Sequence, residues 1–205
     1  MIAIVNYGMG NLGSIKNMLR KVGAESIITS DPDVIMKSHK VILPGVGAFD
    51  TGMTQLADMD LLEVLNHKAL VEKVPILGVC LGVQLMTKGS EEGVLPGLGW
   101  FDAQTRKFNF DNIQGKFPLP NMGWLEVKLA KPSKLFEGMY EEPRFYFVHT
   151  YHLVPNIKTD ASMLAHYGYD YVAALEAENI MGVQFHPEKS HKFGIRLYEN
   201  FVKLF

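Results

Sequence analysis

The chain has 205 residues, of which 47% are hydrophobic and 20% charged, an ordinary composition for a soluble globular protein. Its 20 basic and 22 acidic residues nearly cancel and form no Lys/Arg stripe, so neither nucleic acid nor a membrane surface is expected as a partner. The single cysteine excludes an internal disulfide and favours a reducing, cytoplasmic location. The amino terminus lacks a signal peptide's basic region, and no apolar run reaches the roughly 20 residues of a membrane span.

Strand and helix signals alternate through the first half of the chain. Short apolar runs predict strands separated by segments with helical spacing, and these strands fall at residues 2–5, 26–29, 41–43 and 75–80. Gly23 ends the first helix, while Asp60 followed by Glu63 indicates a capping-box start for a later one. The alternation predicts an α/β fold with a largely parallel central sheet flanked by helices. In such a fold the site lies at the carboxyl ends of the strands.

The second half has a different pattern. Helical spacing is scarce between residues 93 and 181, and the β-rich runs there lie at 144–151, 162–167 and 171–176. We expect antiparallel strands that extend the sheet or form a small second one. A last helix should follow Ser190, its predicted cap, with an apolar core stripe made of Phe193, Leu197, Phe201 and Leu204. No linker or repeat divides the sequence, so residues 1–205 are expected to form a single domain.

The only cysteine lies between two glycines, as Gly78-x-Cys80-x-Gly82, at the end of an apolar run. This pattern is typical of a nucleophile elbow, in which a strand turns sharply into a helix and small neighbours let the backbones approach. The turn would expose the thiol at a helix amino end, which favours negative charge, and would aim the amide of Leu81 at a developing oxyanion. A buried core cysteine is the alternative for this residue type taken alone.

A histidine and a carboxylate that can serve the thiol occur about a hundred residues later. An apolar strand ends at His186, Pro187 fixes the chain direction, and Glu188 follows. Residues two apart in an extended chain project to the same side, so the carboxylate can hold the imidazole in one tautomer. Activation of a thiol needs a base, and the base needs a group that orients it. The three residues therefore predict a triad of Cys80, His186 and Glu188.

Two motifs, Gly-x-Cys-x-Gly-x-Gln and His-Pro-Glu, resemble those of the class I (triad) glutamine amidotransferases. Within that class, further segments are similar to the glutaminase subunits of imidazole glycerol phosphate synthase, from histidine biosynthesis: residues 7–12, 44–49, 121–124 and 186–190. The resemblance runs from the first strand to the last helix. It implies flavodoxin-like layering of the sheet, no cofactor, and hydrolysis of L-glutamine to glutamate through a thioester on Cys80.

The glycine-rich turn at residues 44–47 follows a predicted strand near the elbow and can present an N–H group to an oxyanion. In the resembling family this segment is the oxyanion strand, which implies a donor within Gly45, Val46 and Gly47 beside that of Leu81. The family's strand requires a reorientation to point its donor inward, so the site is expected to be idle until something reorients it. An ordinary βα turn is the alternative.

Substrate recognition is expected to involve residues near the elbow. Gln84 lies one helical turn after the cysteine, so its side chain should face the same pocket. The family pattern implies that Glu92 holds the substrate ammonium and that the backbone at Thr150 and Tyr151 holds its carboxylate. Glu91 is a near-equal candidate for the ammonium, and a solvated surface charge is the alternative for Glu92.

Released ammonia needs an acceptor, and this chain offers no second active site to supply one. The resemblance implies a heterodimer with a (β/α)8-barrel cyclase, which makes imidazole glycerol phosphate and aminoimidazole carboxamide ribonucleotide. Aromatic, flexible or basic residues flanking the site are the expected contacts, namely Met122, Trp124, Tyr146 and Lys189. Plain core or surface roles are the alternative for them. A subunit that feeds another acceptor synthase and a catalytically silent regulatory subunit remain alternatives for the whole chain.

A competing pattern lies near the amino terminus. The spacing Gly8-x-Gly10-x-x-Gly13 follows a strand and opens a helix, and Asp31 stands where a dinucleotide-binding unit places its ribose-binding acid. Residues 6–7 interrupt the passage from strand to glycine, and the chain has no second mononucleotide half. The dinucleotide-binding module is therefore kept only as a minor alternative.

The histidines do not match a metal signature. Four of them could act as ligands by residue type, but their spacings fit no known ligand set: His149, His152, His186 and His191. A single cysteine also removes the common structural zinc sites. We therefore expect neither a metal nor, in the absence of a Gly-x-x-x-x-Gly-Lys-Ser/Thr motif, a nucleotide-activating site.

Overall fold

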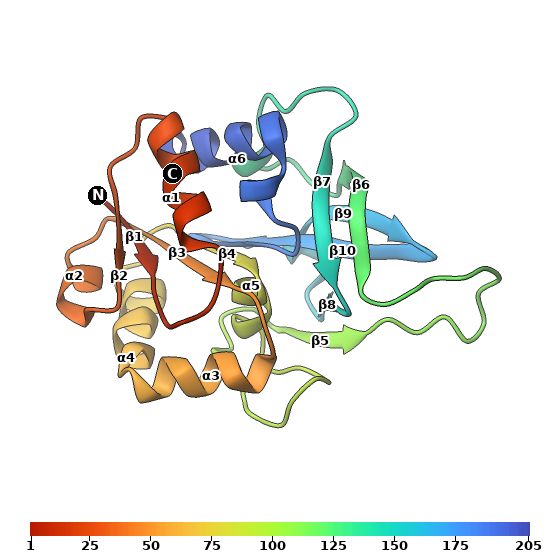
Figure 1. The fold of residues 1–205 in the computed structure, drawn as a ribbon, viewed down its shortest axis with the longest axis horizontal. Helices are drawn as coiled ribbons and strands as arrows, with labels where there is room; N and C mark the ends of the chain where they lie inside the picture. Colours follow the sequence, from red (N-terminus) through yellow and green to blue (C-terminus); the bar gives the residue numbers. More distant parts are fainter.

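A computed structural model describes residues 1–205. It contains a central sheet with helices on both faces (Figure 1). One half of the sheet is parallel and contains β1 (Ile2–Val5), β2 (Ser26–Thr29), β3 (Lys40–Gly45), β4 (Ile76–Cys80) and β11 (Ile180–Val183). The predicted strands in this half are confirmed, and β3 extends further than expected. All five strands run in one direction, so their carboxyl ends meet at one edge.

Side chains of the parallel strands alternate between two hydrophobic cores. In β1, Ile2 and Ile4 face one core, while Ala3 and Val5 face the other. All four are buried, because helices cover both faces of the sheet. A strand buried on both sides reads as a continuous apolar run, which is why these strands stand out in the sequence.

The other half of the sheet is antiparallel. It contains β5 (Ala103–Lys107), β6 (Asn121–Leu129), β7 (Arg144–His149), β8 (Tyr151–Pro155), β9 (Ala161–Tyr167) and β10 (Tyr169–Ala177). The strand order is β2-β1-β3-β4-β11-β10-β9-β6-β7, and β8 pairs with β5 and β10 off this path. The expected antiparallel strands therefore extend the sheet, although β5 and β6 were not foreseen.

The run at residues 144–151 was predicted as one strand and is two. The chain bends at Thr150 because the flanking segments pair with different partners, β7 with β6 and β8 with β5. The Thr150 carbonyl accepts a hydrogen bond from the amide of Phe108. The bend places Thr150 and Tyr151 beside the carboxyl ends of the parallel strands, where they line the cavity described below.

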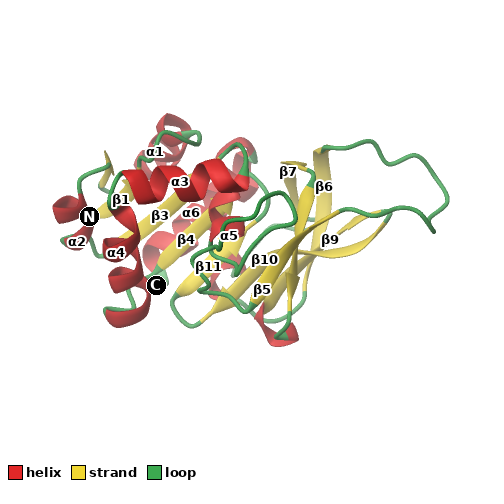
Figure 2. Ribbon diagram, turned by 90° about the horizontal axis from the view of Figure 1, so that it is seen from below, coloured by secondary structure: helices red, strands yellow, loops and turns green.

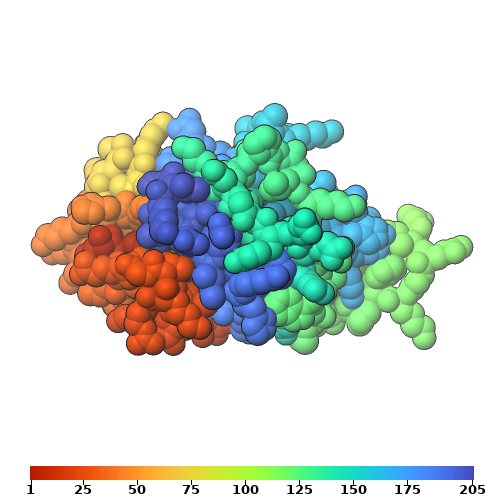
Figure 3. Space-filling model, turned by 90° about the horizontal axis from the view of Figure 1, so that it is seen from above, coloured from red at the N-terminus to blue at the C-terminus, as the bar shows by residue number.

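Helices form a layer on each side of the sheet (Figures 1 and 2). One layer contains α1 (Leu12–Lys21) and α6 (His191–Lys203), which pack on each other and are seen in red and blue in Figure 3. The other contains α2 (Pro32–Met36), α3 (Phe49–Asp58), α4 (Leu61–Asn66) with η1 (His67–Val71), and α5 (Leu81–Leu85). Short 3-10 turns are η2 (Lys134–Phe136), η3 (Lys158–Asp160) and η4 (Pro187–Lys189). None of these helices is long and apolar enough to cross a membrane.

Three expectations at helix ends differ from the structure. The helix after Asp60 exists, but Asp60 has a left-handed backbone (φ 55°) and makes no side-chain cap, because a capping residue needs extended geometry to reach the helix amides. Ser190 precedes α6 without capping it, since its hydroxyl instead donates to the His186 carbonyl at 2.6 Å. Leu204 lies beyond α6 and is 37% exposed, whereas the other three residues of the predicted stripe are buried.

The close packing of α6 against η4 yields a stability prediction. A Cβ atom at Gly194 would overlap the Pro187 carbonyl oxygen, so Gly194→Ala should lower the free energy of unfolding by about 2 kcal/mol. A Cβ atom at Gly13 in α1 would meet no other atom within 4 Å. Gly13→Ala should therefore raise stability by roughly 0.5–1 kcal/mol. Urea unfolding of both variants checks the pair, and shifts of the same sign would contradict this packing.

Candidate active site

Cys80 lies at the turn from β4 into α5, with a positive φ (φ 54°, ψ −111°) that is rare for a residue with a side chain. The flanking glycines are needed because the backbones crowd. A Cβ at Gly82 would overlap the Leu43 carbonyl, and one at Gly78 would lie 2.7 Å from the Met86 sulfur. The sequence therefore folds locally into the expected elbow, and Cys80 is 7% exposed at the wall of a cavity.

His186 follows β11, which pairs with β4, so the imidazole comes to the same edge of the sheet as the thiol. Its Nδ1–H donates to Glu188 Oε1 at 2.8 Å, and both side chains are about 1% exposed. The expected contact therefore forms, but for a different reason. Residues 187–189 turn as the 3-10 segment η4, and this turn rather than an extended chain brings Glu188 back to the ring.

The ionisation states of His186 and Glu188 depend on each other. Burial by itself lowers the pKa of His186, but the Cys80 sulfur and the Glu188 carboxylate outweigh burial and raise it to about 10. Burial by itself raises the pKa of Glu188. The hydrogen bond and the charge interaction with His186 outweigh burial, so the net effect is a lowered pKa of Glu188. His186 Nε2 has no fully formed hydrogen bond, although it lies close enough to respond to the sulfur. A protonated imidazole held by the Glu188 carboxylate suits later donation of a proton to a leaving group.

Asn11 is a positioning residue that the sequence analysis missed. Its Nδ2 donates to Glu188 Oε1 at 3.0 Å, the same oxygen that accepts the hydrogen bond from His186. The bond joins the loop before α1 to η4, across 177 positions of the chain. Asn11 belongs to a segment that carried the family resemblance, but nothing in its local pattern indicates a contact with Glu188.

A cavity of about 170 Å³ lies over the elbow. Most of the predicted oxyanion and substrate residues line it together with Cys80: Val46, Gly47, Leu81, Gln84, Glu92, Thr150 and Tyr151. Gly45 lies behind this wall, in register with Cys80 on the neighbouring strand. The structure thus brings residues from four separate stretches of sequence around one small chamber.

Glu92 and Glu91 differ clearly in their surroundings. Glu92 lines the cavity, and its Oε2 accepts a hydrogen bond from the amide of Phe49 at the start of α3. Glu91 turns away from the cavity, and its Oε2 accepts from the amide of Lys107. The geometry therefore favours Glu92 as the carboxylate that meets a substrate ammonium.

Tyr7 lies on the buried side of the glycine-rich turn and anchors it by a hydrogen bond. Its hydroxyl donates to the Pro44 carbonyl at 2.6 Å, and the whole side chain is buried. A Cβ at Gly45 would lie 2.5 Å from this hydroxyl, so only glycine fits there. Val46, one residue further on, is 46% exposed, and Gly47 has φ 132°. The turn is thus anchored at Pro44 and less constrained beyond it.

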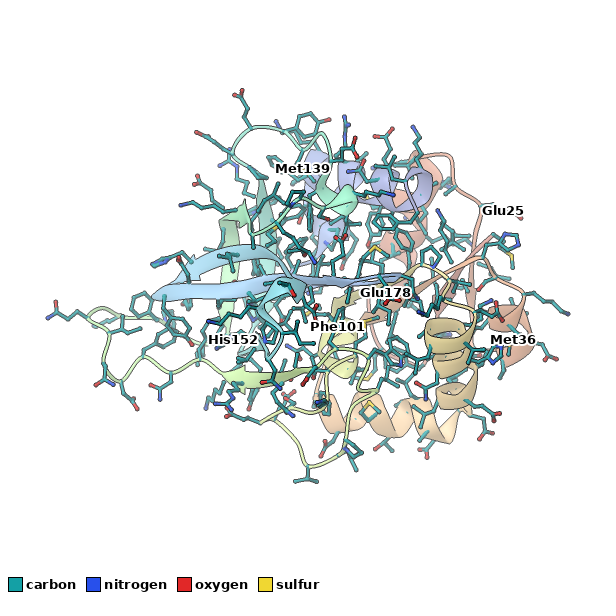
Figure 4. All side chains as sticks on the ribbon, turned by 180° about the vertical axis from the view of Figure 1, so that it is seen from behind. Glu25, Met36, Phe101, Met139, His152 and Glu178 are labelled. Atoms are coloured by element: carbon teal, nitrogen blue, oxygen red, sulfur yellow. The ribbon has the colours of Figure 1, made fainter.

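The remaining histidines have other roles. His149 lines the cavity, but its Nδ1 donates to the Tyr151 carbonyl at 2.8 Å, and burial lowers its pKa to about 3. His152, labelled in Figure 4, lies among aromatic rings, with Phe108 at 4.7 Å between centroids. His191 stacks on Trp124. Histidine, cysteine and acidic side chains nowhere gather in a group that could hold a metal ion.

The amino-terminal glycine loop contributes to the same site. Gly10 packs against Pro44, and Asn11 binds Glu188. Asp31, the acid of the dinucleotide pattern, instead accepts a hydrogen bond from the amide of Asp33 and caps α2. The loop therefore supports the elbow, and its acid has a structural role.

The four expected interface residues gather on one exposed area beside the site. Met122 is 62% exposed and Trp124 is 41% exposed, both on β6. Tyr146, on β7, lies directly opposite Trp124 on β6, and the Lys189 ammonium lies 5.5 Å from the Tyr146 ring centroid. We call these four residues the aromatic patch. Tyr146 is half-buried, not fully buried in the core.

Comparison with known proteins agrees with this geometry. Residues 3–204 match the family Glutamine amidotransferase class-I. The chain belongs to this family. Imidazole glycerol phosphate synthase subunit HisH 2 of Methanococcus maripaludis is 52% identical over 203 residues, 99% of each chain. The subunit HisH 2 of Pseudomonas aeruginosa is 43% identical over the full length of both chains. A crystal structure of a glutamine amidotransferase, 17% identical, aligns over 100% of this chain and 98% of its own with a TM-score of 0.71, which supports the fold.

As a glutamine amidotransferase, the chain should depend on the contact between Asn11 and Glu188. Asn11→Ala should lower kcat for glutamine hydrolysis about tenfold, because Glu188 loses the donor that fixes its orientation toward His186. Asn156→Ala is the matched control, since Asn156 also donates to a carboxylate, that of Asp102, at 2.7 Å on the exposed surface. Steady-state kinetics of both variants measure the effect, and equal activities would contradict it.

Tyr7→Phe tests the anchoring of the glycine-rich turn. A donor aimed at an oxyanion matters in the transition state, so kcat should fall about tenfold while KM for glutamine changes little. Tyr167→Phe removes a comparable hydroxyl bond, to the Pro118 carbonyl at 2.7 Å, on an exposed segment. That control should keep its activity. A rise in KM alone for Tyr7→Phe would show that the hydroxyl serves binding and not the oxyanion.

Proposed function

We propose that this chain is the glutaminase subunit of an imidazole glycerol phosphate synthase, in histidine biosynthesis, built as one amidotransferase domain over residues 1–205. It hydrolyses L-glutamine to glutamate and delivers ammonia to a cyclase partner. The observation that carries the proposal is the buried pair of His186 and Glu188 next to Cys80, at the wall of a small cavity. Full-length relatives at 52% and 43% identity that bear this subunit's name support the choice of synthase.

The first half of the reaction forms a thioester. The Cys80 thiolate attacks the side-chain amide carbon of glutamine, and the carbonyl oxygen becomes an oxyanion. The amide of Leu81 can donate to it, because the first amides of a helix have no partner within the helix. The second donor comes from the segment Gly45, Val46 and Gly47. His186, held by Glu188, then gives its proton to the departing nitrogen, the C–N bond breaks, and ammonia leaves.

The second half regenerates the thiolate. His186, now neutral, takes a proton from water, and the water oxygen attacks the thioester carbon. The C–S bond breaks, its electron pair returns to sulfur, and glutamate is released. Throughout, Glu92 faces the substrate ammonium, while the backbone of Thr150 and Tyr151 faces the carboxylate. Gln84 lies on the same wall. A chamber of about 170 Å³ suits one amino acid of this size.

The partner is proposed to be a (β/α)8-barrel cyclase bound at the aromatic patch, in the cytoplasm. Hydrogen bonds of backbone groups link this patch directly to the triad. The amide of His186 donates to the Tyr146 carbonyl at 2.9 Å, and the amide of Tyr146 donates to the Ser190 hydroxyl at 3.0 Å. A partner that shifts Tyr146 would therefore also shift the imidazole. This coupling agrees with a site that stays idle until the cyclase and its ligand bind.

Cys80→Ser tests the proposal in the complex with the cyclase subunit of imidazole glycerol phosphate synthase. The variant should lose glutamine-dependent synthesis by at least a hundredfold, because serine lacks the thiolate that starts the reaction. Added ammonium should still support synthesis by the same complex. Loss of both activities would count against the assignment.

The chain's single cysteine allows a second readout. A glutamine-like electrophile should label Cys80 alone, faster when the cyclase and its ligand are bound. An unlabelled chain would be a silent regulatory subunit. A labelled chain that transfers no ammonia to this cyclase would point to another acceptor synthase.

A further inference from the structure

Gln184 is a buried carboxamide that the proposed mechanism does not use. It lies between β11 and His186 and has no exposed surface. Its Nε2 lies 4.0 Å from the Cys80 sulfur, and its Oε1 accepts a hydrogen bond from Gln84 Nε2 at 3.1 Å. A polar side chain buried this completely next to the nucleophile needs its hydrogen-bonding groups satisfied, and both of its ends are directed at site residues.

One backbone carbonyl fixes the orientation of both amides. The Tyr151 carbonyl can only accept, so the group of Gln84 that faces it at 3.2 Å must be the nitrogen. The other N–H of that nitrogen then points to Gln184, which must offer its oxygen. The nitrogen of Gln184 is therefore left facing the sulfur. We call this chain, from the Tyr151 carbonyl through Gln84 and Gln184 to Cys80, the amide relay.

We infer that Gln184 is a catalytic residue whose side-chain N–H stabilises negative charge on the Cys80 sulfur. The inference rests on the proposed function and deepens it. Negative charge is on the sulfur twice in the reaction, in the resting thiolate and again when the C–S bond of the thioester breaks and its electron pair returns to sulfur. An N–H directed at the sulfur favours both states, because a hydrogen bond to an ionised acceptor is stronger than one to a neutral acceptor.

The amide relay also connects the substrate pocket to the nucleophile. The backbone of Tyr151 is the proposed site for the substrate carboxylate, and the carbonyl of the same residue starts the relay. Because Gln84 uses both N–H groups within the relay, its Oε1 remains free to accept from glutamine. Gln84 therefore has two roles, one toward the substrate and one in orienting Gln184.

Alkylation of Cys80 by iodoacetamide tests the inference without glutamine or partner. The chain has one cysteine, so the rate reports that thiolate alone. Gln184→Met keeps an unbranched side chain but has no N–H, and it should slow alkylation at neutral pH about tenfold. Gln84→Leu should slow it several-fold, because the amide of Gln184 would no longer be held in one orientation. Gln184→Leu is a second variant in case the first does not fold.

Asn200→Leu is the matched structural control. Asn200 is also a buried carboxamide, and its Nδ2 donates to the carbonyls of Leu135 and Glu137, away from the thiol. This variant should unfold at lower urea concentration and alkylate at the native rate while folded. A native rate in a folded Gln184 variant would overturn the inference. A chain with the expected alkylation rates but no glutamine hydrolysis in the complex with the cyclase and its ligand would instead refute the proposed function, so the two failures are distinguishable.

Discussion

The close approach of two backbone segments at the elbow is the constraint on which the site depends. The turn between β4 and α5 presses against the end of β3, where the Leu43 carbonyl leaves no room for a side chain at Gly82. Cys80 has a strained backbone with positive φ that costs on the order of 1–3 kcal/mol, and only surrounding structure can maintain it. The parallel strands and the helices on both faces supply that support. The thiol is therefore presented at a fixed position on the cavity wall.

The triad is a small buried electrostatic unit that no single element could hold. Glu188 and His186 would each resist ionisation if buried alone, and they remain charged because each satisfies the other. Asn11 comes from the first loop of the chain and Cys80 from the fourth strand. Three distant stretches thus meet at one edge of the sheet, which is where parallel strands place their carboxyl ends.

The same arrangement links the buried site with an exposed surface. β6 presents Met122 and Trp124 to solvent, while Asn121, the first residue of that strand, bonds inward to His149 and Tyr171. His149 in turn donates to the Tyr151 carbonyl at the cavity. Contacts at the aromatic patch and the orientation of the cavity wall are therefore connected through buried hydrogen bonds. Such a connection suits an enzyme whose ammonia is useful only when an acceptor is present.

Local patterns in the sequence were enough to predict the strands of the parallel half, the elbow around Cys80, and the pair His186 and Glu188, because these features depend on apolar runs, flanking glycines and short spacing. Features that depend on distant contacts became visible only in the folded chain. Folding split the run at residues 144–151, since its two parts pair with different strands. The fold placed Glu92 at the cavity and turned Glu91 away from it. It also brought Asn11, Tyr7 and Gln184 to their hydrogen-bond partners. A polar side chain carries no local signal of the atom it will meet a hundred residues away.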